Sequence, residues 1–253
     1  MLRAYAQQTE TNQEHRYLFM DYAPTLRHIV RSPRPTDHDA NETCPAEPDV
    51  ELLAPDPNWL TAADALMTAL AARDDETGGH AERVVSFSLR LGREVGLSQP
   101  DMIALELGAR LHDVGKIGVP DSILHKPAEL DTEEWLKMRY HPTRGEQMVR
   151  KLKLPEAAAL VVGQHHEQWN GAGYPNGLVG EQISLPARVF SVIDAFDAIT
   201  SDRVYRAAAP YEEAMRRITA AAGTQFDPQV VAAFIRIDPV EWQRMRIASL
   251  DQN

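Results

Sequence analysis

The chain has 253 residues, of which 43% are hydrophobic and 25% charged, as in an ordinary globular protein. Its formal net charge of −11 argues against a DNA-binding protein that contacts nucleic acid over a broad surface. No apolar run approaches the ~18 residues of a membrane span, and the N-terminus lacks the apolar core of a signal peptide. The single cysteine, Cys44, excludes an internal disulfide, so a cytoplasmic protein without a membrane segment is expected.

The N-terminal part of the chain, residues 1–58, is predicted to lie outside the folded domain. Residues 35–58 carry seven carboxylates and no Lys or Arg, and six prolines fall between positions 33 and 57. Because prolines and like charges oppose helix formation and burial, residues 33–57 are interpreted as a disordered linker. The preceding residues are too few for a domain and form at most a helix around Leu18–Val30.

From Trp59 onward the apolar residues recur at helical spacing, and start signals punctuate the pattern. Ser98 with Asp101, and Asp131 with Glu134, have the spacing of capping boxes. Prolines begin further helices near residues 155, 186 and 228, the last after Asp227 as N-cap. Gly115 and Gly118 are expected to end one helix in a loop. No convincing alternation typical of strands occurs, so residues 59–253 are predicted to be one all-α domain of about eight or nine helices.

Eight metal-ligand candidates recur along this domain and form the main functional signal. Imidazole and carboxylate ligands without thiolates suit iron, manganese or zinc in a reactive site, whereas structural zinc sites normally use cysteines. Eight ligands are too many for one ion, so two or three metals are expected. The alternative is a set of ordinary surface or core histidines. The candidates are Glu76, His80, His112, Asp113, His141, His165, His166 and Asp194.

The local spacing of these residues indicates how they can meet. Glu76 and His80 are four residues apart and would share one face of a helix, although two glycines lie between them. The adjacent pair His112–Asp113 can reach one cluster near a helix C-terminus, where Asp113 could bridge two ions. Asp194 lies in an apolar segment and needs a partner there, either a metal or a salt bridge; Asp197 is interpreted as an outer supporting residue.

Three cations follow the ligand candidates and suit a phosphate. Lys116 comes after Asp113, and Arg203 and Arg206 come after Asp194. Arginine holds phosphate with a planar fork and lysine acts as a point charge, while a pair of metals activates water for attack on phosphorus. A solvated surface cation is the alternative for each.

Four segments then resemble one family. HDVGKIGVPDSILHKPAELDTEEW, YHPTRGEQM, HHEQWNGAGYPNGLVGEQI and ARVFSVIDAFDAITSDRVYR resemble the HD-GYP branch of the HD metal-dependent phosphohydrolases, over about residues 70–235. The resemblance implies an all-helical fold and a phosphodiesterase that hydrolyses cyclic di-GMP to pGpG, and often on to GMP, by metal-activated water. It carries metal ligation to the eight candidates, a third metal to Glu76, and phosphate contact to Lys116, Arg203 and Arg206. Iron or manganese is the expected metal.

The chain departs from the family pattern at a few positions. Asn170 replaces the usual aspartate before the GYP loop; it keeps a turn-forming residue, but activity falls if the aspartate orients a ligand histidine. Val204 and Ile193 also differ from the usual residues without being ligands. Tyr174 of the GYP loop is expected either to stack on a substrate base or to pack. The family further suggests that this loop contacts diguanylate cyclases of the GGDEF type.

Two alternatives to a cyclic di-GMP phosphodiesterase remain. One is a phosphohydrolase for another cyclic dinucleotide, such as cyclic GMP-AMP, or for another nucleotide. The other is a catalytically weak signalling or docking module, which would be expected to lack one of the metal-binding residues. The sequence does not indicate the oligomeric state.

Overall fold

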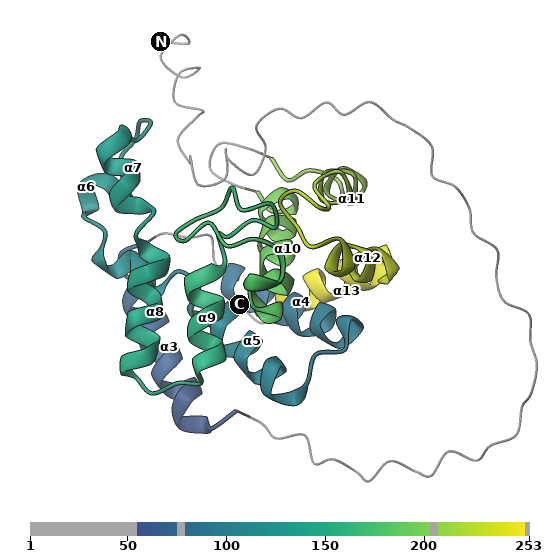
Figure 1. Ribbon diagram of the computed structural model, residues 1–253, viewed down its shortest axis with the longest axis horizontal. Coiled ribbons are helices and arrows are strands. Elements are labelled where there is room, and N and C mark those ends of the chain that lie inside the picture. Colours follow the sequence, from purple (N-terminus) through teal and green to yellow (C-terminus); the bar gives the residue numbers. More distant parts are fainter. Residues whose placement is uncertain (1–54, 75–78, 203–206, 251–253) are drawn as a thin grey trace, which may run out of the picture.

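The computed structural model describes residues 55–74, 79–202 and 207–250, and its helices pack around a central α10 (Figure 1). Residues 1–54, with most of the expected linker, lie outside the described part, as do Glu76, Arg203 and Arg206. The α-helices are α3 (Pro57–Ala71), α4 (His80–Val95), α5 (Gln99–Leu111), α6 (Asp121–Leu124), α7 (Thr132–Met138), α8 (His141–Lys151), α9 (Glu156–Gln164), α10 (Leu185–Thr200), α11 (Tyr211–Ala220), α12 (Pro228–Arg236) and α13 (Pro239–Leu250).

The all-α prediction is confirmed. Nine of these helices have nine residues or more, and the two short helices α6 and α7 add to the expected number. Two 3-10 helices, η1 (Val114–Gly118) and η2 (Gly180–Gln182), complete the regular structure of the described residues, which otherwise contain only two isolated β-bridges. None of the described helices has the length and apolar character needed to cross a bilayer.

The helix starts follow from local side-chain chemistry. Ser98 accepts the backbone N–H of Asp101, and Asp131 and Glu134 form the predicted capping box of α7. Asp227 caps α12 with Pro228 at the first position, as expected. The predicted linker end is wrong in one respect: Asp56 caps α3 and Pro57 is its first residue, because proline at N1 lacks only an N–H that has no helical partner.

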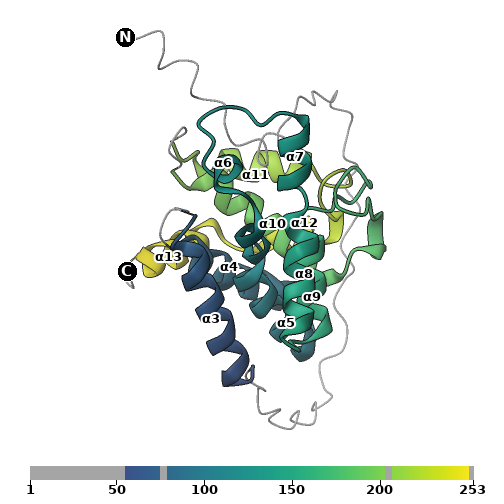
Figure 2. The same cartoon turned by 90° about the vertical axis from the view of Figure 1, so that its left-hand side faces the viewer.

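Two large apolar clusters form most of the core, and α5 and α9 contribute to both, while a small third cluster contains Val119, Ile123 and Met138. One cluster gathers side chains of α4, α10, α11, α12 and α13 around Phe87, Phe196, Phe234 and Trp242. The other joins α3, α5, α8 and α9, and α8 and α9 lie side by side in both views (Figures 1 and 2). Since α5 and α9 are shared, their C-terminal ends are held between the two halves of the core.

Glycines allow the closest approaches beside the site. A Cβ on Gly108 of α5 would lie 2.4 Å from Cβ of Val161 in α9. A Cβ on Gly115 would lie 1.9 Å from the carbonyl oxygen of His141. Gly115 belongs to η1 rather than to the predicted loop, and its missing side chain lets η1 lie directly against the start of α8.

Candidate metal centre

The candidate ligands stand at helix ends that converge on one place. His80 is the first residue of α4, and His141 is the first of α8. His112 and His165 follow the last residues of α5 and α9 as their C-caps, and Asp194 lies within α10. The helix-end position predicted for His112–Asp113 is confirmed. The shared helix face considered for Glu76 and His80 falls on a residue outside the described part, since Glu76 is not described; α4 begins at His80, after Gly79 with φ of 85°.

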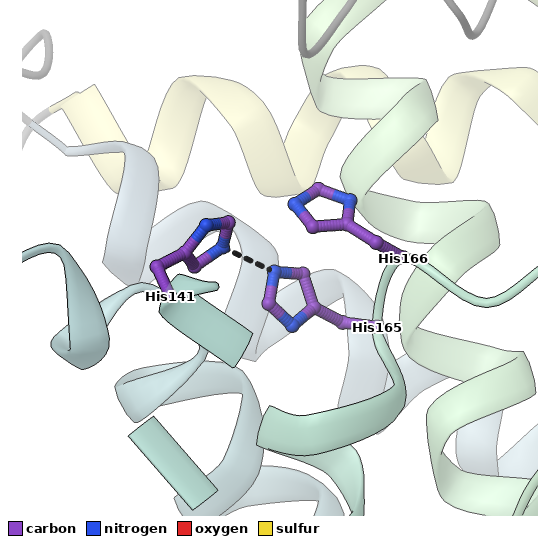
Figure 3. Close-up of side chains that lie close together, drawn as sticks. All are labelled: His141, His165 and His166. Carbon is purple, nitrogen blue, oxygen red and sulfur yellow. Dashed lines mark hydrogen bonds between the residues drawn. The ribbon is translucent and has the colours of Figure 1, made fainter. Parts of the chain in front are cut away.

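The first group of ligands consists of His141, His165 and His166. Figure 3 shows their three rings around a common space, with a nitrogen of His141 directed at one of His165. The two Nε2 atoms of His141 and His165 are 3.2 Å apart. One nitrogen from each of the three rings lies within 4.8 Å of the others, so the three can share one ion. We call this set the His141 group.

The second group consists of His80, His112 and Asp194, and its ligand atoms also lie within 4.8 Å of one another. Nε2 of His80 is 3.9 Å from Oδ1 of Asp194. All three side chains are buried, with 3–8% of their surface exposed. A buried carboxylate facing two imidazoles is costly unless a cation or protons balance it. We call this set the His80 group.

Asp113 connects the two groups. Its Oδ2 is 3.0 Å from Nε2 of His112, and its Oδ1 is 3.3 Å from Nε2 of His141. Burial raises the pKa of Asp113, but the neighbouring His112 and then Lys116, with Nζ at 3.0 Å, outweigh burial, and the pKa lies well below its usual range. An ionised carboxylate with one oxygen toward each group lies where the bridging role expected of Asp113 would require it.

The hydrogen bonds of the rings prepare their Nε2 atoms as ligands. Nδ1 of His112, His141 and His165 lies 2.7–3.0 Å from the backbone carbonyl oxygens of Ala109, Met138 and Val162. A carbonyl only accepts, so each Nδ1 carries the proton and Nε2 keeps its lone pair. Nδ1 of His80 lies 2.8 Å from the carboxylate of Asp197 instead. Such partners of the second nitrogen are usual for metal-bound histidine.

The same tautomers leave acceptor atoms facing each other. Nε2 of His141 and Nε2 of His165 both carry lone pairs at 3.2 Å, and Nε2 of His112 faces a carboxylate oxygen. Burial, then the neighbouring His141 and His112, lowers the pKa of His165 well below its usual value, so His165 is not the ring that takes up a proton at this contact. A divalent cation would be shared by all of these converging nitrogen and oxygen atoms, so the residues fit a metal centre with imidazole and carboxylate ligands.

Lys116 and the GYP loop border the centre. Lys116 is 7% exposed and reaches Asp113 and, at 3.5 Å, Asp74. The ring centroids of Tyr174 and His166 are 4.7 Å apart. The guanidinium carbon of Arg139 lies 4.4 Å from the ring centroid of Tyr174. Tyr174 therefore packs beside the candidate ligand His166, which corresponds to the second of the two expectations for this residue.

The loop is organised by a buried carboxylate that the sequence interpretation passed over. Glu167 accepts the backbone N–H groups of Asn176 and Leu178, and burial raises its pKa. Its position directly after two histidines was the available signal. The side-chain oxygen of Asn170 accepts the backbone N–H of Ala172, two residues on, and so stabilises a local turn at the start of the loop.

Seven of the eight predicted ligands lie in the described part, and all seven come together in the two groups and Asp113. Glu76, Arg203 and Arg206 lie outside it. The interpretation missed Arg83 and Arg246, which both contact Asp197. Arg83 follows His80 by three residues on α4, which was a usable signal, whereas nothing in the sequence links Arg246 to Asp197.

Comparisons with known proteins agree with this arrangement. The family profile described as HD domain matches residues 64–230. A cyclic di-GMP phosphodiesterase of Thermotoga maritima is 40% identical over 66% of the chain and 46% of its own length. The 3'3'-cGAMP-specific phosphodiesterase 2 of Vibrio cholerae is 38% identical over 66% of the chain and 32% of its own length.

The fold has a counterpart among solved structures. An HDG"Y"P protein from Bdellovibrio bacteriovorus superimposes with a TM-score of 0.50 at 25% identity, over 70% of the chain and 57% of that structure. The chain spans less than half the length of the two phosphodiesterases named above.

Proposed function

The chain belongs to the HD-domain family, with the motifs of its HD-GYP branch, and we propose that it is a metal-dependent phosphodiesterase that hydrolyses cyclic di-GMP to pGpG and on to GMP. The observation that carries this proposal is the placement of Asp113, with one carboxylate oxygen toward each of two imidazole groups. A docking module without catalysis has no need for that arrangement, and every ligand in the described part is in place.

The ligands divide naturally between two ions. The His141 group would hold one, the His80 group would hold the other, and Asp113 would contact both. Glu76 would supply a third site, with histidines shared from the set. Iron or manganese suits this mixture of imidazole and carboxylate, which contains no thiolate. Bound metals would lower the pKa of water to near ~7 and so supply the nucleophile.

The side chains of the chain itself bind and orient the substrate. Lys116 lies beside Asp113 and offers a positive charge to a non-bridging phosphate oxygen. Arg203 and Arg206 are proposed to hold the remaining phosphate charge, while water attacks the phosphorus in line with the departing 3′ oxygen. With Tyr174 against His166, the GYP loop forms a wall beside the His141 group. No side-chain nucleophile is required, so no covalent phosphoenzyme is expected.

Three finer points belong to the same proposal. The cytoplasm is the expected location, since cyclic dinucleotide messengers are the proposed substrates. A GGDEF-type cyclase is a candidate partner of the GYP loop. Cyclic GMP-AMP is the alternative substrate, because a relative with nearly the same identity carries a cGAMP-specific name.

The test is an anaerobic purification followed by metal analysis and hydrolysis assays. We expect at least two ions per chain and conversion of cyclic di-GMP to pGpG and GMP. Cyclic GMP-AMP assayed at the same concentrations decides the substrate preference. A metal-loaded protein that hydrolyses neither cyclic dinucleotide would refute the proposed function, and a trapped phosphoenzyme would refute attack by water.

A further inference from the structure

A buried carboxylate behind the His80 group is held by cations from two helices. Asp197 in α10 is 1% exposed, and its Oδ2 lies 2.8 Å from Nδ1 of His80. Arg83 in α4 donates from Nε to Oδ1 at 2.7 Å and from Nη2 to Oδ2 at 3.1 Å. The second cation is Arg246 of α13, whose Nη2 is 3.3 Å from Oδ1. Each oxygen of Asp197 therefore receives two donors.

Arg246 also donates hydrogen bonds to the C-terminal end of α10, beyond Asp197. Its Nη1 donates to Oγ of Ser201 at 3.1 Å, and its Nη2 donates to the hydroxyl of Thr200. The guanidinium lies 5.7 Å from the ring centroid of Phe87 in α4. The planar fork of arginine fixes these contacts relative to one another. Arg246 thus ties α13 to α4 and to the last turn of α10.

These contacts determine where Asp197 points. With Oδ1 fixed by Arg83 and Arg246, the carboxylate presents Oδ2 to Nδ1 of His80. The partner of Nδ1 sets the tautomer and the ring orientation of a metal-binding histidine. It follows that the direction of Nε2 of His80, toward Asp194, depends on a chain of contacts that begins in α13.

We propose that Arg246 is a positioning residue for the His80 group, acting through Asp197 on His80. The inference rests on the metal-binding part of the proposed function. Helix α13, Pro239–Leu250, lies beyond the segment 64–230 that the HD-domain profile matches. The C-terminal helix thereby supports one of the two groups from outside the matched domain, whereas His141 and His165 of the other group have backbone carbonyls at Nδ1.

The test measures stepwise Mn²⁺ binding to the full metal-free chain, without any nucleotide. Asp194→Ala identifies the binding step of the His80 group, and His166→Ala identifies that of the His141 group. Arg246→Met removes the charge and keeps an apolar stem against Phe87. We expect it to weaken the His80-group step about tenfold, the lower end of the ~10–100-fold cost of losing an outer partner. The His141-group step should be unchanged.

Two further variants separate positioning from a general structural role. Arg246→Lys keeps a cation and should restore part of the affinity. Arg244→Met, an exposed position on the same helix, should leave both steps unchanged. In a background of Asp197→Asn, which alone should cost about 10–100-fold at the His80 group, Arg246→Met should add no further loss if it acts through Asp197.

The outcomes decide the inference in both directions. A selective, lysine-rescued loss at the His80 group supports it. Unchanged affinity, an equal loss at both groups, an additional loss in the Asp197→Asn background, or the absence of any step abolished by Asp194→Ala overturns it. If Arg246→Met fails to fold, Arg246→Lys and its double variant carry the same comparison. Failure to hydrolyse cyclic di-GMP, with both binding steps intact, would refute the proposed function and leave this inference standing.

Discussion

Asp113 is the residue at which the two histidine groups meet, so its removal should affect both ions. Asp113→Ala should weaken metal binding by at least the ~10–100-fold that loss of an outer partner costs, and hydrolysis should fall with it. The helical fold should persist, because the apolar clusters do not include Asp113. Metal analysis, circular dichroism and a hydrolysis assay check this, with Asp64→Ala at an exposed helix position as control. Full hydrolysis by a metal-depleted Asp113→Ala protein would contradict it.

Glu76 is proposed to complete a third metal site. In anaerobically prepared protein, Glu76→Ala should lower the metal content by one ion per chain and leave the two ions of the described groups. Elemental analysis of matched preparations provides the measurement, with the exposed Glu82→Ala as control. Two ions per chain in the wild-type protein, unchanged in Glu76→Ala, would count decisively against a third site.

Arg203 is proposed to hold phosphate charge without touching a metal. Arg203→Ala should raise KM and lower kcat/KM by about 10–100-fold, since one hydrogen bond to a charged group contributes ~1.5–3 kcal/mol. Metal content should not change. Steady-state kinetics on cyclic di-GMP check the prediction against Arg244→Ala, and kinetics identical to wild type would remove Arg203 from the site.

The convergence of the candidate metal ligands could be predicted from the sequence because their chemistry is unusual for their surroundings. Imidazoles at helix ends and Asp194 in an apolar segment both require partners, and the partners proved to be one another. Arg246 carries no such signal. An arginine on a C-terminal helix normally contacts solvent, and its contact with Asp197 spans 49 residues. The packing of both α13 and α10 on α4 brings the two residues together.

At the scale of elements, the contact of η1 with α8 sets the separation of the two groups. The η1 turn directly follows His112–Asp113, and α8 begins with His141. Gly115→Ala would place a Cβ 1.9 Å from the backbone of His141, so η1 must move away from α8. We expect a loss of about 1–3 kcal/mol of stability together with weaker metal binding.

Gly96→Ala is the matched control for this prediction. Gly96 has φ of +82° and open space around its Cα, so alanine there costs roughly 1–2 kcal/mol of backbone strain without touching the site. Thermal unfolding should therefore report similar losses for the two variants, and metal titration should separate them. Equal metal affinity in both variants would show that the η1–α8 contact does not control the centre.

Helix boundaries were predictable where a side chain caps its own helix. Ser98, Asp131 and Asp227 act on N–H groups two or three residues away, so the sequence contains the whole interaction. The start of α3 was misplaced because Pro57 was read as a helix breaker rather than as a first residue. The end of the helix before η1 was correct, but its continuation as a 3-10 turn depends on packing against α8.

At the scale of the whole molecule, part of the acidic charge lies outside the HD domain. Six of the seven carboxylates of residues 35–58 precede the described part, and the HD-domain match begins at residue 64. The charge of −11 therefore overstates the acidity of the domain that is proposed to bind an anionic dinucleotide. Removal of the N-terminal segment should leave the folded, active domain.

Two truncations test this and locate the domain boundary. Deletion of residues 1–54 keeps Asp56, whose side chain accepts the N–H of Asn58 at 2.8 Å. This protein should retain wild-type stability, metal content and hydrolysis.

Deletion of residues 1–57 removes the cap and places a charged amino group at the start of α3, where the helix dipole is unfavourable for it. We expect about 0.5–2 kcal/mol lower stability, with hydrolysis retained, because α3 packs through Leu60, Ala63 and Met67 against the half of the core that holds α5. Thermal unfolding and hydrolysis assays on both proteins decide the matter: loss of catalysis on deletion of residues 1–54 would make the N-terminal segment part of the active domain, and equal stability of the two truncations would show that Asp56 is not the functional boundary of α3.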